Sequence, residues 1–247
     1  LLSLLNSYTN LAVAYSGGVD STYLADCAHE ALGEQASIII ADSPSLPRSE
    51  LAEAIELAKE RCWNLHIIYP KEYENPAYLA NQGDRCFHCK DALFNQMKHY
   101  MKQHPNTILA FGAIEDDKSD IRPGTIAAEN HNAVAPLQEV NLFKSEIRQL
   151  SLHRGLPTAE KASFACLGSR FPKGTPITLD KLSQVEKAEE ILRTHGYKQY
   201  RVRHHNEICR IELEPNDFSK LINERELIIK EIKKTGYRYV TLDINGY

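Results

Sequence analysis

The 247-residue sequence has no long hydrophobic run; its densest apolar stretch is Ile38 to Ala41. A transmembrane helix needs about 20 consecutive apolar residues, so we expect no membrane-spanning segment. An excess of positive charge is also missing, because 29 Lys and Arg residues stand against 33 Asp and Glu, for a formal net charge of -4. A protein that coats nucleic acid through its overall charge would be basic. Nucleic acid is therefore not an expected partner.

Cysteine is scarce, and six cysteines in a chain of this length do not make the disulfide-dense framework of a small secreted domain. The first five residues carry neither a basic flank nor a cleavage-like site, so we expect no signal peptide. The chain begins at Leu1 rather than Met, which suggests that a few residues have been trimmed. These features predict a protein of the reducing cytoplasm.

Two common nucleotide-binding motifs are absent. The Walker pattern G-x-x-x-x-G-K-S/T does not occur, which argues against an enzyme that transfers the γ-phosphate through a P-loop. The dinucleotide fingerprint G-x-G-x-x-G does not occur either. Any nucleotide site in this chain must therefore be built differently.

Short apolar segments alternate with helical patterns over the first 155 residues. Strands are predicted at 11–15, 38–41, 66–69 and 107–111, and helices lie between them, one of which should stop at Gly33. This alternation predicts an α/β fold with an open parallel sheet and helices on both faces. The length favours either one large domain or one large domain with a small companion.

The pattern changes after residue 155. Residues 156–178 are rich in Gly, Pro, Ser and Lys and show little periodicity, and a loop of this length is usually functional. Beyond it the sequence predicts a helix at 179–195, strands at 200–204 and 208–213, a helix at 217–234 and a strand at 237–244. We therefore predict a first domain at 1–155, a functional loop at 156–178 and a small α+β domain at 179–247.

The segment Ser16-Gly-Gly-Val-Asp-Ser21 lies between the first strand and the first helix. Gly17 and Gly18 allow a tight turn and a close approach to an anion, which the N–H groups and positive dipole end of the helix would receive. Ser16 and Ser21 add hydroxyl donors, and Asp20 can orient a Mg²⁺ ion or the loop. The position predicts a phosphate site, and the alternative is a glycine turn capped by serines.

S-G-G-x-D-S after a strand resembles the pyrophosphate loop of the N-type ATP pyrophosphatases, which cleave ATP between the α- and β-phosphates and adenylate their substrate. The resemblance implies ATP as cofactor and an adenine nucleotide hydrolase-like (PP-loop) fold. It also implies that the end of the second strand contacts adenine, through Ala41, Asp42 and Ser43. For Ser43, a simple turn residue before Pro44 is an equally good interpretation.

An acidic segment follows the fourth strand, where open α/β sheets bind ligands. Mg²⁺ takes a few carboxylates together with phosphate oxygens, so these carboxylates could hold Mg²⁺ on the pyrophosphate. The predicted magnesium ligands are Asp116, Asp117 and Asp120. Gly112 and Arg122, at either side of them, are predicted to contact the nucleotide. A solvated acidic loop is the alternative.

The long loop contains Cys166, with Ser169 and Arg170 close behind it. A cysteine is usually a small core hydrophobe, but polar neighbours surround this one and Arg170 could favour its thiolate. Cys86 and Cys89 form a C-x-x-C pair, which in a reducing compartment indicates metal, cluster or redox chemistry. The remaining cysteines, on apolar faces, are predicted to be core residues: Cys27, Cys62 and Cys209.

Five motifs occur in the same order as in the LarE-type ATP-dependent sulfur transferases, and the chain resembles that family nearly end to end. They are S-G-G-V-D-S, D-D-x-x-D-x-R-P-G, P-L-Q-E-V-x-L-x-K-x-E-I-R (136–148), G-L-P-T (155–158) and A-C-L-G-S-R-F-P-x-G-T-P-I-T (165–178). The resemblance implies adenylation of the carboxylates of pyridinium-3,5-biscarboxylic acid mononucleotide and replacement of the activated oxygen by sulfur. The product is the pincer ligand of the nickel cofactor of lactate racemase.

The resemblance also implies that sulfur reaches the adenylate from Cys166. In one branch of the family this cysteine gives up its own sulfur and becomes dehydroalanine, and that branch lacks the C-x-x-C. Because Cys86 and Cys89 are present, we favour three thiolates that hold a 4Fe–4S cluster, with an exogenous sulfide on the fourth iron. The alternatives are sacrificial transfer, a structural zinc site with His88, and two unremarkable thiols. For the function of the whole protein, the alternatives are a tRNA thiolase, an amide-forming ligase and a non-catalytic ATP-binding module.

The last segments predict an anion site. Period-2 alternation puts Arg201, Arg203 and His205 on one face of a strand, and two guanidiniums suit the phosphate of a nucleotide substrate. A charged edge strand is the alternative. The family resemblance further implies a divalent metal near three carboxylates, those of Glu189, Glu212 and Asp217. The expected partners are a small nucleotide substrate and further copies of the chain in a homo-oligomer.

Overall fold

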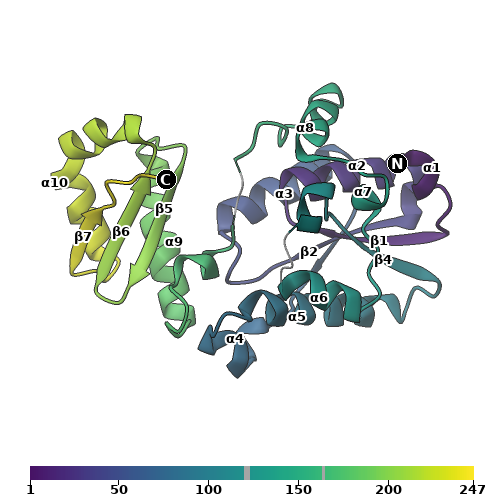
Figure 1. Cartoon of the computed structure of the whole chain (residues 1–247), viewed down its shortest axis with the longest axis horizontal. Coiled ribbons are helices and arrows are strands. Elements are labelled where there is room, and N and C mark those ends of the chain that lie inside the picture. Colours follow the sequence, from purple (N-terminus) through teal and green to yellow (C-terminus); the bar gives the residue numbers. More distant parts are fainter. Residues whose placement is uncertain (120–122, 163–164) are drawn as a thin grey trace. The chain divides into compact units, whose positions relative to one another are not determined.

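The computed structural model describes residues 1–119, 123–162 and 165–247 and divides the chain into two compact units (Figure 1). The first unit consists of Leu1–Tyr78 and Asp84–Phe164, and the second of Leu79–Gly83 and Ala165–Tyr247. None of the helices in the described ranges is long and apolar enough to span a bilayer.

A parallel sheet organises the first unit. Its strands are β1 (Asn10–Tyr15), β2 (Ala36–Ala41), β3 (Asn64–Ile68) and β4 (Thr107–Phe111). They are ordered β3-β2-β1-β4, and every neighbouring pair is parallel. The predicted open parallel sheet is confirmed.

Helices cover both faces of this sheet. The longer ones are α2 (Val19–Leu32), α3 (Arg48–Glu60), α5 (Arg85–Met101), α6 (Pro123–Asn130) and α8 (Lys144–His153). Short helices add one or two turns at α1 (Leu2–Leu5), α4 (Pro76–Ala80) and α7 (Pro136–Glu139). Alternate strand residues enter two separate cores: Leu11 and Val13 join the core with α2 and α3, whereas Ala12 packs with Phe94 and Met97 of α5. Successive side chains of a strand point to opposite faces of the sheet, and helices cover both faces. The strands are therefore apolar on both sides.

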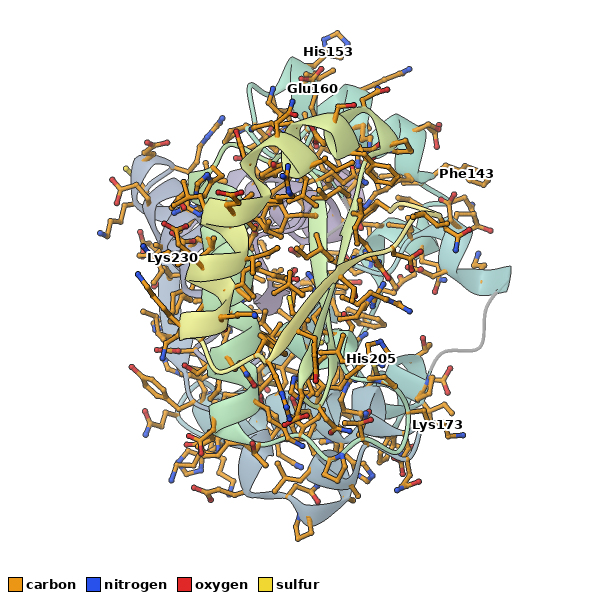
Figure 2. The ribbon with its side chains drawn as sticks, turned by 90° about the vertical axis from the view of Figure 1, so that its left-hand side faces the viewer. Phe143, His153, Glu160, Lys173, His205 and Lys230 are labelled. Carbon is orange, nitrogen blue, oxygen red and sulfur yellow. The ribbon has the colours of Figure 1, made fainter. Side chains whose placement is uncertain are left out.

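The second unit is a small α+β assembly. A short 3-10 helix, η4 (Leu167–Arg170), is followed by α9 (Leu179–Thr194), β5 (Tyr200–His205), β6 (Ile208–Leu213), α10 (Phe218–Lys234) and β7 (Tyr239–Leu242). β5 pairs antiparallel with β6, and β6 pairs parallel with β7. α10 buries Leu221 and Ile228, while Lys230 points away from the sheet (Figure 2). The predicted order of these elements is confirmed.

The second unit also includes a short segment from the middle of the chain, Leu79–Gly83. The buried Asn81 amide donates hydrogen bonds to the carbonyls of Pro172 and Thr175, at 2.8 and 3.1 Å. The N–H of Gly174 returns a bond to the carbonyl of Asn81 at 2.8 Å. The two units therefore do not follow simple ranges of the sequence, and the functional division at 155 and 178 stays a prediction.

Candidate functional site

The loop between β1 and α2 requires a glycine at position 17. Gly17 has a positive φ of 73°, a conformation that L-residues with a side chain rarely adopt. A Cβ atom at this position would also lie 3.0 Å from the Cβ of Ala54 in α3. Conformation and packing therefore both exclude a larger residue, and the loop backbone lies directly against α3.

Two serine hydroxyls hold this loop. The Oγ atoms of Ser16 and Ser21 are 3.0 Å apart, and the backbone N–H of Ser16 donates to Ser21 Oγ at 3.1 Å. Gly18 is the N-cap of α2, with extended backbone, and no side chain caps the helix. The first N–H groups and the positive end of α2 are therefore available to an anion, as predicted for a phosphate loop.

The start of α2 also lies close to the residue that follows β4. A Cβ atom at Gly112 would be 3.0 Å from the backbone nitrogen of Ser21 and 3.2 Å from its Cα. Glycine therefore allows β4 to end against the first turn of α2. This packing requirement explains the glycine without a nucleotide contact, and the contact itself stays a prediction.

Lys144, which is not among the predicted site residues, lies beside this loop. Lys144, the first residue of α8, donates to both carboxylate oxygens of Asp20, at 2.8 and 2.7 Å. Asp20 was predicted to orient Mg²⁺ or the loop, and its partner in the structure is this ammonium group. Lys144 lies in the P-L-Q-E-V-x-L-x-K motif, which was the only available signal. It supplies a positive charge beside a loop that lacks the Walker lysine.

Carboxylates of the acidic segment after β4 accept hydrogen bonds from backbone N–H groups. Asp116 accepts from the backbone N–H of Lys144 at 2.9 Å, and Asp117 accepts from that of Ile114 at 3.1 Å. The other two predicted residues, Asp120 and Arg122, lie outside the described residues. Within the described ranges, no three His, Cys, Asp or Glu side chains are grouped as metal ligands. The magnesium site stays a prediction.

At the end of β2, the side chains fix the turn that follows. Arg48 Nη1 and Asp42 Oδ1 are 2.5 Å apart, and the Ser43 hydroxyl donates to the buried carboxylate of Glu72. Ser45 Oγ also donates to Glu72, at 3.0 Å. The Ser43 hydroxyl therefore joins the turn, where it accepts from the N–H of Ser45 at 3.0 Å, to a distant buried carboxylate. A contact of this turn with adenine stays a prediction.

The six cysteines fall into different environments. Cys86 is exposed and Cys89 partly exposed, one turn apart at the start of α5, and Cys166 is partly exposed at the N-cap of η4. Burial raises the pKa of Cys27 to about 11 and that of Cys209 to about 12, which keeps both core thiols protonated. The prediction that Cys62 is a core residue is wrong. It is exposed with a positive φ of 53°, because α3 has already ended at Glu60.

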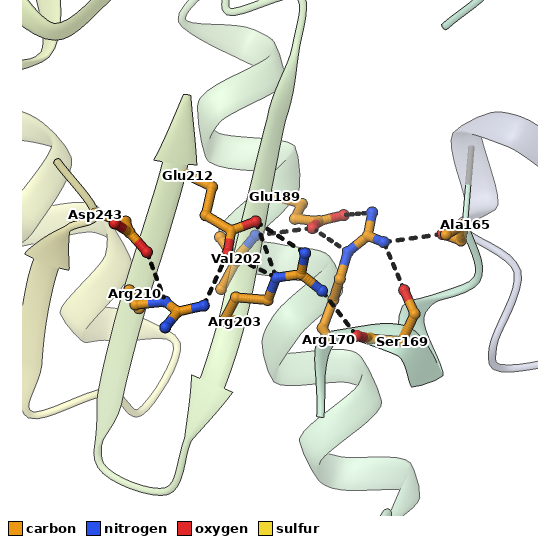
Figure 3. A network of polar contacts seen from close by, with 9 residues as sticks. All are labelled: Ala165, Ser169, Arg170, Glu189, Val202, Arg203, Arg210, Glu212 and Asp243. Carbon is orange, nitrogen blue, oxygen red and sulfur yellow. Dashed lines mark hydrogen bonds and ion pairs between the residues drawn. The ribbon is translucent and has the colours of Figure 1, made fainter. Parts of the chain in front are cut away.

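Arg170 is buried and has an acidic partner on α9 (Figure 3). It is 3% exposed, and its Nε donates to Glu189 Oε1 at 2.7 Å. Its Nη1 donates to the carbonyl of Ala165 at 3.1 Å and to Ser169 Oγ at 2.9 Å. Arg170 therefore does not act as a free cation for Cys166. It neutralises Glu189 and binds the backbone carbonyl before the cysteine and the hydroxyl of Ser169 after it.

Arg201, Arg203 and His205 share the partly exposed face of β5, while Val202 and His204 are buried between them. The predicted arrangement is therefore present, but both arginines already have partners. Arg203 Nε donates to Glu212 at 2.9 Å and its Nη1 to the carbonyl of Ser169 at 2.9 Å (Figure 3). The Arg201 guanidinium lies 4.5 Å from the centre of the Tyr247 ring.

The carboxylates predicted near a divalent metal also have other partners. Glu189 pairs with Arg170 and accepts a bond from the N–H of Val202 at 2.9 Å. Burial acts to raise the pKa of Glu212, but hydrogen bonds and charges from Arg203 and Arg210 outweigh it, so the pKa is lowered. Asp217 is the N-cap residue of α10. The structure thus gives two of these carboxylates arginine partners, and no observation supports a metal ion there.

These features define the class of protein. A parallel α/β sheet carries an S-G-G-x-D-S loop at the uncapped start of its first long helix, without a Walker lysine, which is the PP-loop fold. A glutamine-hydrolysing GMP synthase of Ruegeria sp. is 28% identical over 212 residues, 74% of this chain and 40% of that protein. No family model matches the chain.

Other relatives match nearly the whole chain. The pyridinium-3,5-bisthiocarboxylic acid mononucleotide synthase of Lactiplantibacillus plantarum is 31% identical over 248 residues, 100% of this chain and 90% of that protein. An uncharacterized protein of Synechocystis sp. is 39% identical over 237 residues, 95% of this chain and 88% of that protein. The chain belongs to the family of this synthase, the LarE family, and it is an enzyme, a sulfur transferase.

Proposed function

We propose that the enzyme uses ATP to adenylate a carboxylate of pyridinium-3,5-biscarboxylic acid mononucleotide and then converts it to a thiocarboxylate. This reaction belongs to the biosynthesis of the nickel-pincer cofactor of lactate racemase. The observation that carries the proposal is the uncapped start of α2 behind the S-G-G-V-D-S loop, in a chain that aligns over its whole length with a synthase of the bisthiocarboxylic mononucleotide.

The first half-reaction is assigned to the loop, α2 and Lys144. A carboxylate oxygen of the substrate attacks the α-phosphorus of ATP, the bond to the bridging oxygen breaks, and pyrophosphate leaves. The N–H groups at the start of α2 and the ammonium of Lys144 offset the charge that develops on the leaving group. Asp116, Asp117 and Asp120 would hold Mg²⁺ on its oxygens.

The second half-reaction is assigned to Cys166. Sulfur attacks the acyl carbon of the adenylate, and AMP leaves with the carboxylate oxygen. Cys86 and Cys89 suit cluster ligation, because both thiols are at least partly exposed and lie one turn apart on α5. With Cys166 they would hold a 4Fe–4S cluster that supplies an exogenous sulfide. If Cys166 instead gives up its own sulfur, it becomes dehydroalanine.

The substrate phosphate is assigned to Arg201 and Arg203. Arg203 contacts Glu212 through Nε and Nη2 and the carbonyl of Ser169 through Nη1. A guanidinium has five N–H donors, so further donors remain for a phosphate. Charge-assisted bonds from the two side chains suit a phosphate monoester. We also assign the protein to the cytoplasm, where free thiols persist, and its homo-oligomeric state stays a prediction from the sequence.

The test is a nucleotide and product analysis of anaerobically purified protein given ATP, Mg²⁺, sulfide and the mononucleotide. We expect AMP, pyrophosphate and thiocarboxylate, and no thiocarboxylate from Cys166→Ala. Cys62→Ala, which changes an exposed cysteine outside the proposed site, is the matched control and should retain activity. ADP and phosphate as the main products, or an amide formed from ammonia without Cys166, would contradict the proposal.

The sulfur source has its own test. A cluster predicts bound iron and labile sulfide that are lost in Cys86→Ala and Cys89→Ala, with repeated turnovers on added sulfide. Sacrificial transfer predicts one sulfur per chain and a loss of about 34 Da, the mass of H₂S, from the protein. That mass loss with Cys86→Ala still active would remove the cluster and leave the sulfur transferase in place.

A further inference from the structure

The segment between α8 and the cysteine loop is fastened to the first unit by two arginines. Arg61 Nη2 donates to the carbonyl of Gly155 at 2.6 Å. Arg148 Nη1 donates to the carbonyl of Ala159 at 2.5 Å, and its Nη2 to that of Lys161 at 2.9 Å. Arg61 therefore holds the first residue of the G-L-P-T motif, and Arg148, the last residue of the E-I-R motif, holds residues that follow G-L-P-T.

Lys161 adds an ionic anchor at the end of this segment. Its Nζ lies 2.6 Å from Glu50 Oε2 and 3.0 Å from Glu53 Oε2, both on α3. Its side chain is only 20% exposed. Burial acts to lower the pKa of Lys161, but the hydrogen bonds and charges of Glu50 and Glu53 outweigh it, so the pKa is raised and the ammonium form is held.

The same turn of α3 supports the pyrophosphate loop. A Cβ atom at Gly17 would lie 3.0 Å from Ala54 Cβ and 3.8 Å from the carbonyl oxygen of Glu50. The hydroxyl of Tyr15, the last residue of β1, donates to the carbonyl of Ala54 at 3.2 Å. Glu50 therefore contacts Lys161 through its carboxylate, while its backbone is next to the loop.

We propose that Lys161, through Glu50 and Glu53, is a positioning residue that fixes the start of the cysteine loop beside the pyrophosphate loop. Cys166 follows Lys161 by five residues, and five residues span at most about 18 Å. An anchor at Lys161 thus limits where the sulfur can travel, so that the adenylate meets sulfur before water. The inference rests on the proposed function, because it assigns Lys161 to the transfer step of that reaction.

The structure also separates this role from an ordinary surface ion pair. An exposed pair contributes little, because water screens it and both side chains lose freedom. Lys161 instead meets two carboxylates and is largely buried, and the backbone carbonyl of the same residue is held by Arg148. Loss of the side chain would remove the contact with α3 and leave residue 161 held by the bond from Arg148 to its carbonyl, while Arg61 and Arg148 keep Gly155 and Ala159 in place.

The experiment compares Lys161→Ala with Lys59→Ala, which removes the exposed pair of Lys59 and Glu56 on the same helix. Two rates are measured with ATP and the mononucleotide: ATP–pyrophosphate exchange, and thiocarboxylate formed per AMP. Since small misplacements of a reacting group reduce rates by about a hundredfold, we expect Lys161→Ala to lose at least tenfold in thiocarboxylate per AMP. Its exchange rate should stay within twofold of wild type, and Lys59→Ala should change neither quantity.

Rescue tests the ion pair itself. Lys161→Arg should retain the wild-type amount of thiocarboxylate per AMP. The exchanged pair, Lys161→Glu with Glu50→Lys, should recover part of it. Equal losses in exchange and transfer would mean that Lys161 only stabilises the unit. A raised KM for ATP would mean that it binds the nucleotide. Either result overturns the inference.

A readout independent of catalysis separates this inference from the proposed function. The amides of Leu156, Ala159 and Lys161 donate to backbone carbonyls within the segment or to α8. Hydrogen exchange at the amide of residue 161 should accelerate in Lys161→Ala and remain unchanged in Lys59→Ala, while the amides of Leu156 and Ala159 serve as internal references in both variants. Unchanged exchange would refute the anchor even if the enzyme proves to act on another substrate, whereas failure of wild type to form thiocarboxylate would refute only the function.

Discussion

Single residues decide how the cysteine loop is held, and Arg170 has the largest part in this. Its guanidinium is buried against Glu189 and donates to Ala165 and Ser169, on either side of Cys166. A buried ion pair contributes little relative to an apolar replacement, but removing one partner leaves a charge without compensation. The pair is therefore a structural requirement of the loop.

We expect Arg170→Ala to lower the free energy of unfolding by about 3–5 kcal/mol, because Glu189 would remain buried and unpaired. Arg193→Ala, which removes the exposed pair of Arg193 and Glu190 on the same helix, should cost about 0–1 kcal/mol. Urea unfolding of both variants measures the difference. Equal effects would show that burial of the pair does not matter.

His204 makes the second unit sensitive to acid. Burial, followed by the charges of Lys181 and His205, lowers its pKa from 6.5 to about 4, and its Nδ1 is hydrogen-bonded to the Tyr237 hydroxyl at 3.0 Å. Because the folded pKa is depressed, the unfolded chain takes up the proton first as the pH falls. This contribution to stability is complete above pH 6.5 and is lost as the pH falls toward 4.

The corresponding measurement is the free energy of unfolding as a function of pH. Wild type should lose stability between pH 6.5 and 4 more steeply than His204→Phe, which cannot titrate. His205 is a neighbouring histidine on the partly exposed face of the strand, so His205→Phe is the control and should keep more of the wild-type slope. Identical slopes in wild type and His204→Phe would contradict the assignment.

Among the elements, α2 and α8 together build the proposed anion site. α2 supplies its uncapped N-terminus, and α8 begins at Lys144, whose ammonium reaches Asp20 in the first turn of α2. Asp116 accepts the first backbone N–H of α8 and so helps to place the start of that helix. The position of Lys144 thus depends on three separate segments: the start of α2, the start of α8 and the acidic segment after β4.

We expect Lys144→Ala to slow ATP–pyrophosphate exchange at least about tenfold, because a charge that stabilises the leaving group is lost. Lys118→Ala is the matched control. It removes a lysine of the neighbouring acidic segment whose ion pair with Glu115 is half-exposed, and it should leave the exchange unchanged. A Lys144→Ala enzyme with the wild-type exchange rate would remove Lys144 from the site.

Local periodicity predicted the strands and several of the helices, but not the partners of their side chains. The strands follow from apolar runs, and β4 was predicted with its observed bounds, Thr107–Phe111. The helix α8 was not predicted at all. The pairing of Lys144 with Asp20 joins residues 124 positions apart, and no local pattern contains that information. For the same reason, the pairing of Arg170 with Glu189 could not be predicted from the local sequence.

At the scale of the whole molecule, the chain crosses between its two compact units more than once, because Leu79–Gly83 joins the second unit between two stretches of the first. Proposed nucleotide chemistry lies in the first unit and Cys166 in the second. The C-x-x-C pair lies three residues beyond the crossing at Gly83. We therefore expect this two-part chain to replace oxygen by sulfur at an adenylated carboxylate.

The most direct measurement is mass spectrometry of the mononucleotide after reaction with anaerobic enzyme, ATP, Mg²⁺ and isotopically labelled sulfide, with AMP quantified alongside. We predict a product whose mass reflects replacement of a carboxylate oxygen by sulfur. It should form in proportion to AMP and should be absent with Cys166→Ala. The label should appear in the product if sulfide is the donor, and unlabelled sulfur should appear if Cys166 is consumed. AMP released without any sulfur-containing product would contradict the account.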